Sequence, residues 1–466
     1  MTLYYRAPDC DLYAGDALAV LQGLPDASVQ CCVSSPPYWG LRDYGLPPSV
    51  WGGDPDCAHV WIEEMISTEV GKGNWAQGTN GRGEVQPGGV DAKREPMPST
   101  STRGYCERCK AWRGCLGLEP TPELFVAHIV AVFREVRRVL RNDGVAWVNF
   151  GDSYASESAK GGSGTPNGRN GRGEMYARAG LGGLKPKDLV GIPWRVAFAL
   201  QADGWWLRSD IIWSKPNPMP ESVTDRPTKA HEYLFLLTKS AKYFYDSEAI
   251  KEPANGWNGS VFGDGKSGDA KVYHRQTPHG DKQAAVGKRT YSGFNDRWDE
   301  SEATNGAPAT RNRRSVWEIA TAPYAEAHFA TFPPALVEPC ILAGTSERGA
   351  CSVCGAPWRR VVERETRPNW APPRHEGDVY HRPDSGGGLA NDRRATVETG
   401  WAPTCDHEAP TVPCVVLDPF VGSGTSALVA RQLGRHSIGI DLNPAYLALA
   451  QRRLEGQALP LPLGSA

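Results

Sequence analysis

The fold is decided by the stretch VVLDPFVGSGTSALVARQLGRHSIGIDLNPAYLALAQRRL at residues 415–454. A short apolar strand over 415–417 leads through a Gly-rich turn into a helix that begins near Ser426. A second strand, over 437–440, ends at Asp441. Residues 12–39 read as strand, helix and strand again, near the other end of the chain. Alternation at both ends predicts an α/β domain built on a mainly parallel, doubly wound, Rossmann-like sheet.

The Gly-rich turn has the sequence DPFVGSGT at 418–425. Glycines let the backbone approach a ligand closely, and the amino end of the next helix favours a carboxylate or phosphate. Asp441 follows the next strand, where a carboxylate can accept both hydroxyls of a ribose. These features predict a nucleoside-cofactor site, and the alternative is that Gly422 and Gly424 only make a tight turn. Because Ala427 stands where GxGxxG has its last glycine, a dinucleotide is not preferred.

A second turn, Ser35-Pro36-Pro37-Tyr38-Trp39, follows an apolar strand over 29–33. Two prolines remove two amide donors, so the turn exposes carbonyl oxygens without competing N–H groups. A hydroxyl and two aromatic faces beside these acceptors suit a planar amine. The same sequence also suits an ordinary turn. In a doubly wound sheet, however, this turn and the Gly-rich turn can meet at the switch point, where ligands bind.

These residues resemble the amino-methylating DNA methyltransferases that use S-adenosyl-L-methionine. In one group of that family a (Ser/Thr/Asp)-Pro-Pro-Tyr motif precedes the Asp-Pro-Phe-x-Gly-Ser-Gly-Thr motif, and this chain has the same order, with SSPPYW at 34–39 and DPFVGSGT at 418–425. The resemblance extends over most of the chain, to residues 14–18, 121–150, 211–220, 231–239, 328–344 and 439–446. It implies a Rossmann-like methyltransferase fold, in which the inserted recognition region, 246–315, matches in location only. The loops over 60–104 and 157–183 and the insert over 347–413 lie outside the resemblance.

The resemblance also implies roles for individual residues. On the cofactor side, Asp441 would bind the ribose hydroxyls, Asp16 would face the adenine, and Phe332 and Pro333 would close the methionine pocket. The turn itself would line the methionine and ribose side through Asp418, Phe420, Gly422, Gly424 and Thr425. At the proline turn, which we call the ledge (Ser35, Pro36, Pro37 and Tyr38), Ser35 and the Pro36 carbonyl would accept hydrogen bonds from the target amine. Tyr38 would stack on a base flipped out of double-stranded DNA.

Serine in the first position of the ledge resembles the cytosine-N4 enzymes, and adenine N6 is the alternative target. An RNA or protein-amide methylase would keep the chemistry and change the substrate. A non-catalytic, zinc-containing DNA-binding protein on a methyltransferase frame is an alternative of another class. The intact ledge and cofactor turn favour the enzyme over that alternative.

Two sets of cysteines and histidines have the spacing of zinc knuckles. Each set supplies three sulfurs and one imidazole, a closed tetrahedral ligand set that leaves no position for a catalytic water. We therefore predict two structural zinc ions, with unpaired surface thiols as the alternative and Cys115 as a possible substitute ligand in the first set. The first set is Cys57, His59, Cys106 and Cys109, and the second is Cys351, Cys354, Cys405 and His407.

The periodicity of apolar residues predicts a helix over 121–141, with Thr121 as its N-cap and Asn142-Asp143-Gly144 as its end, followed by a buried strand over 145–150. Further predicted elements are a helix over 194–201, strands over 206–213 and 234–239, and a short helix over 336–342. Residues 60–104 and 157–183 are poor in apolar periodicity and read as loops. Cys31 and Cys32 are assigned to the core.

Length and composition limit the number of folded units and the classes of partner. The 466 residues predict two to three folded units, and 52 glycines with 38 prolines predict long loops. A net charge of −2 makes no general argument for a nucleic-acid partner and leaves local basic patches open. No apolar run is long enough to span a membrane, so a cytoplasmic protein without a membrane partner is expected. The predicted domains are a catalytic part (1–56 and 110–245), a first zinc insert (57–109), a target recognition region (246–315), a cofactor-binding part (316–346 and 414–466) and a second zinc insert (347–413).

A few further residues have two interpretations each. Lys215 and Asn217 either border the base pocket or are solvated, and Asp152 either makes a turn or faces the site. His231 and Glu232 match a family segment but also suit a structural role. The basic cluster of Arg311, Arg313 and Arg314 either contacts phosphates or forms a solvated basic run.

Overall fold

The computed structural model describes residues 2–40, 46–67, 100–155, 183–253, 310–322, 332–364 and 396–456. The chain divides into two compact units, which are described separately. The first consists of Met1–Asp246 with Ser315–Ala466, and the second of Ser247–Arg314. The ledge, the cofactor turn and both cysteine sets belong to the first unit.

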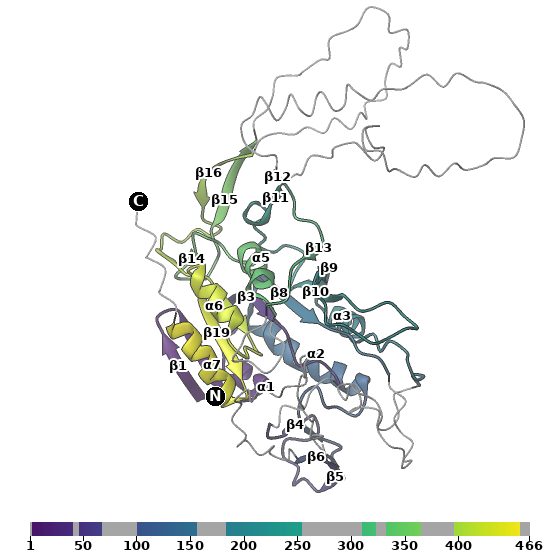
Figure 1. Ribbon diagram of the computed structural model, residues 1–466. Helices are drawn as coiled ribbons and strands as arrows, with labels where there is room; N and C mark the ends of the chain where they lie inside the picture. The colour runs from purple at the N-terminus through teal and green to yellow at the C-terminus, as the bar shows by residue number, and fades with distance from the viewer. Residues whose placement is uncertain are drawn as a thin grey trace, which may run out of the picture. The chain divides into compact units, whose positions relative to one another are not determined.

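A nine-stranded mixed sheet forms the frame of the first unit (Figure 1), in the order β1-β2-β19-β18-β3-β8-β10-β9-β13. The centre, from β2 to β8, is parallel, whereas β10 inserts antiparallel between β8 and β9. The α/β prediction is therefore confirmed. The strands are β1 (Thr2–Ala7), β2 (Cys10–Ala14), β3 (Val29–Ser34), β8 (Leu140–Phe150), β9 (Trp206–Ser214), β10 (His231–Thr238), β13 (Val316–Glu318), β18 (Val415–Asp418) and β19 (His436–Asp441).

Helices form two groups that flank this sheet. In the first group α1 contacts α2 and α2 contacts α3, and in the second α6 contacts both α5 and α7. The first group comprises α1 (Ala17–Gln22), α2 (Pro122–Val139) and α3 (Ile192–Ala202), and the second comprises α5 (Pro334–Gly344), α6 (Thr425–Gln432) and α7 (Pro444–Glu455). This is the doubly wound arrangement that the alternating pattern predicts.

The local sequence of helix α2 predicts where the helix starts but not where it ends. Thr121 is the N-cap, as predicted, and its hydroxyl accepts a 3.2 Å hydrogen bond from the Leu124 amide. The predicted end at 142–144 is wrong, because the helix ends at Val139 and β8 begins directly at Leu140. The start of β8 is paired through Leu140, opposite Val29 of β3, whereas its pairing with β10 runs over Val145–Phe150. The contact of Leu140 with β3 therefore places the end of the helix before Asn142-Asp143-Gly144.

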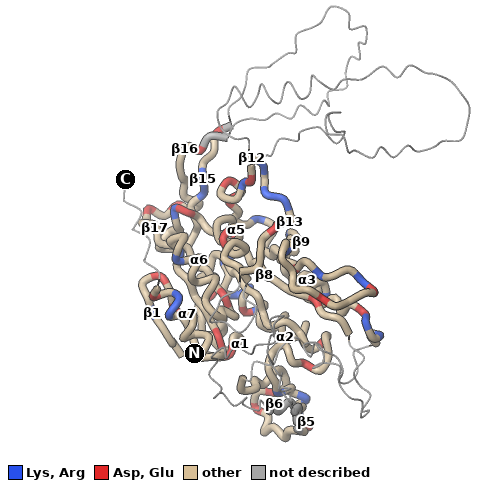
Figure 2. Tube along the Cα trace, in the orientation of Figure 1, with Lys and Arg blue, Asp and Glu red and all other residues tan. Residues whose placement is uncertain are grey.

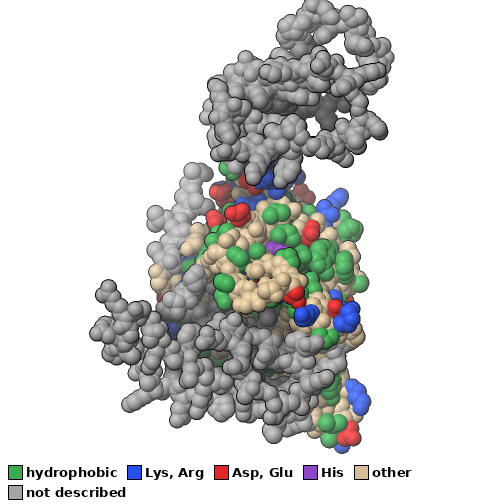
Figure 3. All heavy atoms as spheres, turned by 45° about the vertical axis from the view of Figure 1, so that its right-hand side comes forward, with side chains coloured by type: hydrophobic (Ala, Val, Ile, Leu, Met, Phe, Trp, Pro, Cys, Tyr) green, Lys and Arg blue, Asp and Glu red, His purple; other side chains and the backbone are tan. Residues whose placement is uncertain are grey.

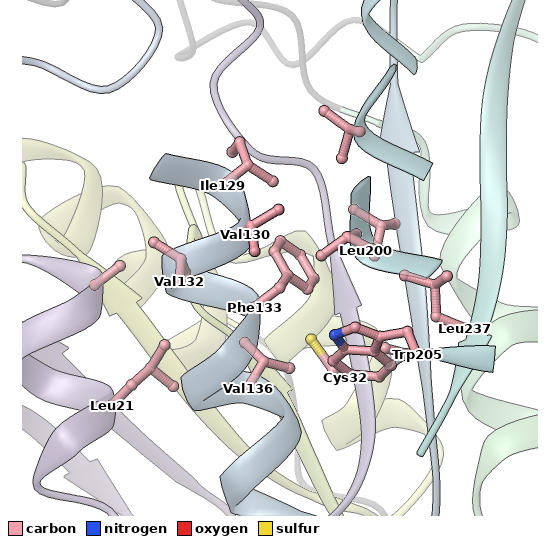
Figure 4. Close-up of a cluster of buried hydrophobic side chains, with 14 of the residues drawn as sticks. Leu21, Cys32, Ile129, Val130, Val132, Phe133, Val136, Leu200, Trp205 and Leu237 are labelled. Atoms are coloured by element: carbon pink, nitrogen blue, oxygen red, sulfur yellow. The ribbon is translucent and has the colours of Figure 1, made fainter. Parts of the chain in front are cut away.

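The core between α2 and the sheet is continuous. Ile129, Phe133 and Val136 are fully buried on one face of α2, where they pack towards Cys32 of β3 and Leu237 of β10 (Figure 4). Burial of each large apolar side chain stabilises the fold by roughly 1.5–3 kcal/mol. Cys31 and Cys32 are both buried, so their assignment to the core is confirmed.

Small sheets form the inserts. A four-stranded sheet in the order β4-β7-β6-β5 holds the first cysteine set, and the pairs β14-β17 and β15-β16 belong to the second insert. Both ends of the loop predicted over 60–104 are thus strands, while residues 68–99 lie outside the described residues, as do residues 157–182 of the second predicted loop. The strands are β4 (Ser49–Trp51), β5 (Trp61–Ser67), β6 (Thr100–Cys106), β7 (Trp112–Gly114), β14 (Ala350–Cys351), β15 (Arg359–Arg364), β16 (Thr396–Ala402) and β17 (Thr411–Val412).

In the second unit the described residues are 247–253 and 310–314. They form a short helix, η1 (Glu248–Ile250), and a strand pair, β11 (Glu252–Pro253) with β12 (Thr310–Arg311). Glu252 forms ion pairs with Arg311 at 2.8 Å and with Arg314 at 2.7 Å, in the basic segment at β12 in Figure 2. Most of the predicted recognition region, residues 254–309, lies outside the described residues. A search of the described helices for one that is apolar and long enough to cross a bilayer finds none.

Candidate active site

The ledge and the Gly-rich turn start from neighbouring strand ends. β3 and β18 are adjacent and parallel, with Cys32 opposite Leu417. The Ser34 hydroxyl, at the end of β3, donates a 2.7 Å hydrogen bond to the carboxylate of Asp418, at the end of β18, and both side chains are buried. The prediction that the two turns meet at one edge of the sheet is confirmed by this pairing.

Asp418 stabilises the start of the Gly-rich turn from inside the fold. Its carboxylate also accepts hydrogen bonds from the Ser426 hydroxyl at 2.5 Å and from the Phe420 amide at 3.0 Å. Burial raises the pKa of Asp418 to about 6, although these hydrogen bonds favour the ionised form. The side chain thus connects β3, β18 and α6, and its contacts are those of a residue that shapes the turn.

The turn has a left-handed backbone at both predicted glycines, with φ of 51° at Gly422 and 81° at Gly424. Other residues adopt this region only with strain. A Cβ on Gly424 would lie 2.8 Å from the Cβ of Ala450 in α7, so the packing of α6 against α7 also requires glycine here. The Thr425 hydroxyl accepts a 2.9 Å hydrogen bond from Arg453 of α7. The structural interpretation therefore accounts for Gly424 and for the Thr425 hydroxyl without a ligand.

Asp441 lies at the end of β19, next to this turn. Its carboxylate accepts hydrogen bonds from the Gly422 amide at 2.9 Å and the Asn443 amide at 2.7 Å. Burial raises the pKa of Asp441 to about 6, against the effect of these two amides, and the charge of Asp418 raises it further. A carboxylate fixed by two amides retains lone pairs for further donors, because each oxygen accepts about two hydrogen bonds.

Asp16 lies at the adjacent strand end. β2 pairs with β19, and the Gly15 amide donates a 3.1 Å hydrogen bond to the Asp441 carbonyl. The Asp16 side chain caps α1 by accepting hydrogen bonds from the amides of Leu18 and Ala19, and its other oxygen accepts one from the Ser49 hydroxyl at 2.9 Å. The structure therefore brings Asp16 and Asp441 to one edge and gives Asp16 a capping role.

The last two predicted cofactor residues lie before α5. Pro333 is the buried N-cap residue of that helix and Phe332 is half-buried. Helix α5 packs on β3, β8 and α6. This segment therefore approaches the sheet from the face that also carries α6.

The ledge is held by polar groups from two other strands. The Tyr38 hydroxyl lies 2.6 Å from a carboxylate oxygen of Glu232 in β10 and 2.7 Å from Oδ1 of Asn149 in β8. The Ser35 hydroxyl lies 3.3 Å from the same Asn149 oxygen. The Asn149 amide nitrogen donates to the Tyr233 carbonyl at 3.1 Å, which determines the orientation of the amide. Both hydroxyls of the ledge are thus positioned by buried or half-buried acceptors.

A glycine makes room for the ring of Tyr38. A Cβ on Gly151 would lie 2.6 Å from Cε2 of Tyr38, and the ring of Phe150 packs at a centroid distance of 6.4 Å. Asn149 and Gly151 were not among the predicted site residues. A polar residue next to the last position of the buried strand VAWVNF is the signal that could have identified Asn149.

Three residues for which the sequence allowed two interpretations, Lys215, Asp152 and Asn217, have different contacts in the structure. Lys215 forms an ion pair with Glu232 and so joins the polar network of Tyr38. Asp152 accepts hydrogen bonds at 3.0 Å from the Gly191 and Ile192 amides, so its side chain holds the amino end of α3. Asn217 is exposed and pairs with the backbone of Thr321.

Both cysteine sets assemble. Within each set the candidate ligand atoms all lie within 4.8 Å of one another. In the first set the Sγ atoms of Cys57 and Cys106 are 3.9 Å apart, and Cys109 Sγ is 3.3 Å from Nδ1 of His59. Cys115 is outside the set, since its sulfur lies 3.2 Å from the Leu46 carbonyl oxygen.

Comparison with known proteins identifies the family. A family model described as DNA methylase, which covers N6 and N4 amino methyltransferases, matches residues 29–351 and 414–452. The Type II methyltransferase M.XycI of Xanthomonas campestris pv. cyanopsidis is 35% identical over 447 residues, which cover 96% of this chain and 88% of that protein. The chain belongs to the N6/N4 DNA methylase family.

A second sequence relative of this DNA methylase supports the family. The Type II methyltransferase M.Cfr9I of Citrobacter freundii is 34% identical and is matched over 96% of the methylase and 88% of its own length. Among solved structures, the PvuII DNA methyltransferase, which is cytosine-N4-specific, aligns over 97% of the methylase and 88% of its own chain, at 13% identity and a TM-score of 0.43. The residues that the family model matches include the ledge and the Gly-rich turn.

Proposed function

We propose that this methylase transfers the methyl group of S-adenosyl-L-methionine to the exocyclic amino group of a base flipped out of double-stranded DNA, with cytosine N4 as the target. The observation that carries the proposal is the hydrogen bond between Ser34 and Asp418. It holds the end of β3, from which the ledge begins, beside the end of β18, from which the Gly-rich turn begins. A methyl donor on the turn and an amine on the ledge are thereby neighbours.

The cofactor side of the proposal assigns roles to two carboxylates. Asp441 would accept hydrogen bonds from the ribose hydroxyls, because its carboxylate is already oriented by the amides of Gly422 and Asn443. Asp16, at the neighbouring strand end, would face the adenine. When bound, the cofactor supplies an electrophilic methyl group on a sulfonium.

The ledge would prepare the amine. The lone pair of an exocyclic amine is delocalised into its ring, so the nitrogen is a weak nucleophile. Acceptors at the Ser35 hydroxyl and the Pro36 carbonyl would hold its N–H groups so that the lone pair points at the methyl group, and this alignment supplies most of the rate enhancement. Pro37 would shape the turn and Tyr38 would contact the flipped base. Asn149 and Glu232 would keep both hydroxyls in place.

Cytosine N4 is proposed over adenine N6 because Ser35 is the first residue of the ledge, a position where the adenine-N6 enzymes more often carry Asp or Asn.

The surface charge bears on contacts with DNA. Figure 3 shows Lys and Arg side chains in separate groups among hydrophobic ones on the described part of one face. Residues 246–315 are proposed as the target recognition region, and Type II modification as the setting.

Three variants test this proposal by separating the two halves of the site. Ser35→Ala and Tyr38→Ala are expected to lower the methyl transfer rate by about 10²-fold or more, because one group aligned with the reacting atoms is lost. Their Kd for S-adenosyl-L-methionine is expected to stay the same, whereas Asp441→Ala is expected to weaken it by roughly 10–100-fold. Ser28→Ala is the matched control, since its exposed hydroxyl bonds only locally, to the Pro25 carbonyl at the other end of β3.

The product determines the base. Mass spectrometry of nucleosides from methylated plasmid DNA is expected to give N4-methylcytosine. N6-methyladenine would move the assignment to the alternative target, and DNA binding with no methylated nucleoside would favour the non-catalytic alternative. Equal loss of cofactor affinity in all three site variants would contradict the separate roles of the two turns.

We also propose that each cysteine set binds one structural zinc ion. A tetrahedral ion with zinc–sulfur bonds of about 2.3 Å places two sulfurs about 3.8 Å apart. The Cys57 and Cys106 sulfurs are 3.9 Å apart, so this pair fits the ion closely. Metal analysis of the purified protein is expected to return two equivalents of zinc, and a protein that folds without metal would remove the proposal.

A further inference from the structure

We infer that the first cysteine set positions the catalytic ledge, at the carboxyl ends of the parallel strands. The second set holds the amino ends of the same strands. This inference rests on the proposed function for the meaning of the ledge. It assigns to the β4–β7 insert a role in the methyl transfer step rather than in stability alone. The positioning residues are Trp51, Trp112, Glu119 and His128, none of which is a metal ligand.

The first cysteine set contacts the strands that carry two buried tryptophans. Trp51 of β4 and Trp112 of β7 are opposite each other in antiparallel strands, and both are buried. β7 follows the knuckle that contains Cys106 and Cys109, and the Cys106 amide donates a 2.8 Å hydrogen bond to the Ala111 carbonyl. On the β4 side, a Cβ on Gly53 would lie 2.8 Å from the Cys109 sulfur. The ligand set therefore determines where both tryptophans lie.

The second step passes from the tryptophans to a buried acid. The His128 ring of α2 stacks on Trp51 at a centroid distance of 4.6 Å and on Trp112 at 5.3 Å. Its Nδ1 is 2.9 Å from a carboxylate oxygen of Glu119, which is 4% exposed. The other oxygen of Glu119 accepts a 2.8 Å hydrogen bond from the Gly117 amide. The segment 117–119 is thus held from the insert side by aromatic stacking and by one buried carboxylate.

The third step joins this segment to the ledge. The Gly40 amide donates a 2.9 Å hydrogen bond to the Gly117 carbonyl, and the Trp39 indole donates one of 2.9 Å to the Glu119 carbonyl. A Cβ on Gly117 would lie 3.2 Å from the Tyr38 carbonyl oxygen and 3.3 Å from Cβ of Pro37. Because the contact is this close, a shift of 117–119 is transmitted to the ledge.

The second cysteine set has contacts of a different kind. The Gln30 side chain, near the start of β3, donates a 2.9 Å hydrogen bond to the Gly355 carbonyl and accepts one of 2.7 Å from the Val415 amide. Arg141, at the start of β8, donates to the Cys354 carbonyl. These residues lie at the amino ends of the parallel strands, whereas the ledge follows the carboxyl end of β3. Figure 1 likewise shows β4–β6 and β14 at opposite ends of the first unit.

The two sets therefore predict different consequences of metal loss. Without a metal in the first set, the Trp51–Trp112 pair loses its support, and residues 117–119 and the ledge lose their fixed position. A displacement of about 1 Å in a reacting group can cost on the order of 10²-fold in rate. The Gly-rich turn, which is held by Ser34, Asp418 and Asp441, is expected to keep its position. Strand β4 touches the cofactor side through the 2.9 Å hydrogen bond from Ser49 to Asp16, so the cofactor affinity is expected to fall by a few-fold at most.

The test measures hydrogen exchange, metal content and kinetics on the full chain. For Cys109→Ser we expect loss of one zinc equivalent and faster amide exchange in residues 35–40 and 115–119, with unchanged exchange in 418–426. The kcat is expected to fall by roughly 10–100-fold, while the Kd for S-adenosyl-L-methionine rises by a few-fold at most. Glu119→Gln is expected to keep both zinc equivalents and to show the same faster exchange and lower kcat.

Two comparisons complete the test. Ile62→Ser, at a side chain that is 60% exposed in β5, is the control in the same insert and is expected to behave like the parent protein. Cys354→Ser in the second set is expected to speed exchange in residues 29–31 and 140–142 and not in the ledge. If Cys109→Ser fails to fold, removal of zinc from the parent protein with 1,10-phenanthroline, followed by zinc addition, gives the same readouts.

The inference is overturned if the first set loses its zinc in a folded protein while exchange in 35–40 is unchanged, or if exchange rises equally in 418–426. Failure of the proposed function has a different signature, namely a parent protein that transfers no methyl group while the exchange pattern still responds to zinc.

Discussion

Replacing Gly151 by alanine tests whether the position of Tyr38 controls methyl transfer. The new Cβ would lie 2.6 Å from Cε2 and 2.9 Å from Cδ2 of the Tyr38 ring. Ordinary carbon contacts in proteins are about 3.5–4.0 Å. The ring must therefore move by roughly 1 Å, away from the position in which its hydroxyl contacts Asn149 and Glu232. The substitution leaves every polar group of the site in the chain, so only geometry changes.

The size of the effect follows from this displacement. A shift of about 1 Å in a positioning group can lower a rate by on the order of 10²-fold. Overpacking in a filled region also costs about 1–3 kcal/mol of stability, which a domain of ordinary stability tolerates. We expect Gly151→Ala to fold, to bind S-adenosyl-L-methionine like the parent protein, and to transfer methyl groups roughly 100-fold more slowly.

The assay is single-turnover transfer of a radiolabelled methyl group to plasmid DNA, with cofactor binding measured by calorimetry. Gly456→Ala is the matched control, because its new Cβ would be 3.4 Å from its nearest neighbour, an ordinary contact. A folded Gly151→Ala protein that transfers methyl groups at the parent rate would refute the reasoning, since the ring would then be free to move without consequence. Loss of cofactor affinity in parallel with the rate would also contradict it.

The remaining predictions concern stability. Gly424→Ala places a side chain at φ 81° and 2.8 Å from Cβ of Ala450, and we expect it to lower the free energy of unfolding in urea by about 1–3 kcal/mol, part of which the double variant with Ala450→Gly should restore. Tyr38→Phe leaves the acceptors at Asn149 and Glu232 without the hydroxyl, and a loss of roughly 1–3 kcal/mol in the same measurement is expected; an unchanged midpoint would mean that water replaces the hydroxyl. Burial raises the pKa of Asp418 from 3.8 to about 6, so the folded state holds this proton more tightly than the unfolded state does. The resulting contribution of about 3 kcal/mol is present below pH ~4 and is lost as the pH rises through about 6, and urea titrations of the cofactor-free protein should show this dependence weakened in Asp418→Asn.

Local sequence was sufficient for most elements and for the composition of both ligand sets. The strands β18 and β19, the helix α6 between them and the N-cap Thr121 of α2 follow from apolar periodicity and turn chemistry, which act over a few residues. The two cysteine sets were paired correctly from spacing alone, and the structure brings each set together. The elements depend on neighbours along the chain. Each half of a cysteine set likewise depends on a short spacing, although the two halves are far apart in sequence.

Tertiary structure decided which strand ends meet and which groups face the ledge. No local pattern indicates that β10 inserts antiparallel beside β8, yet this pairing is what brings Glu232 and Asn149 to the hydroxyl of Tyr38. The same applies to Ser34 and Asp418, which are far apart in sequence and share one buried hydrogen bond. Short-range preferences specify elements and motifs, but strand order and packing bring distant residues together, because burial and hydrogen bonding act in space rather than along the chain.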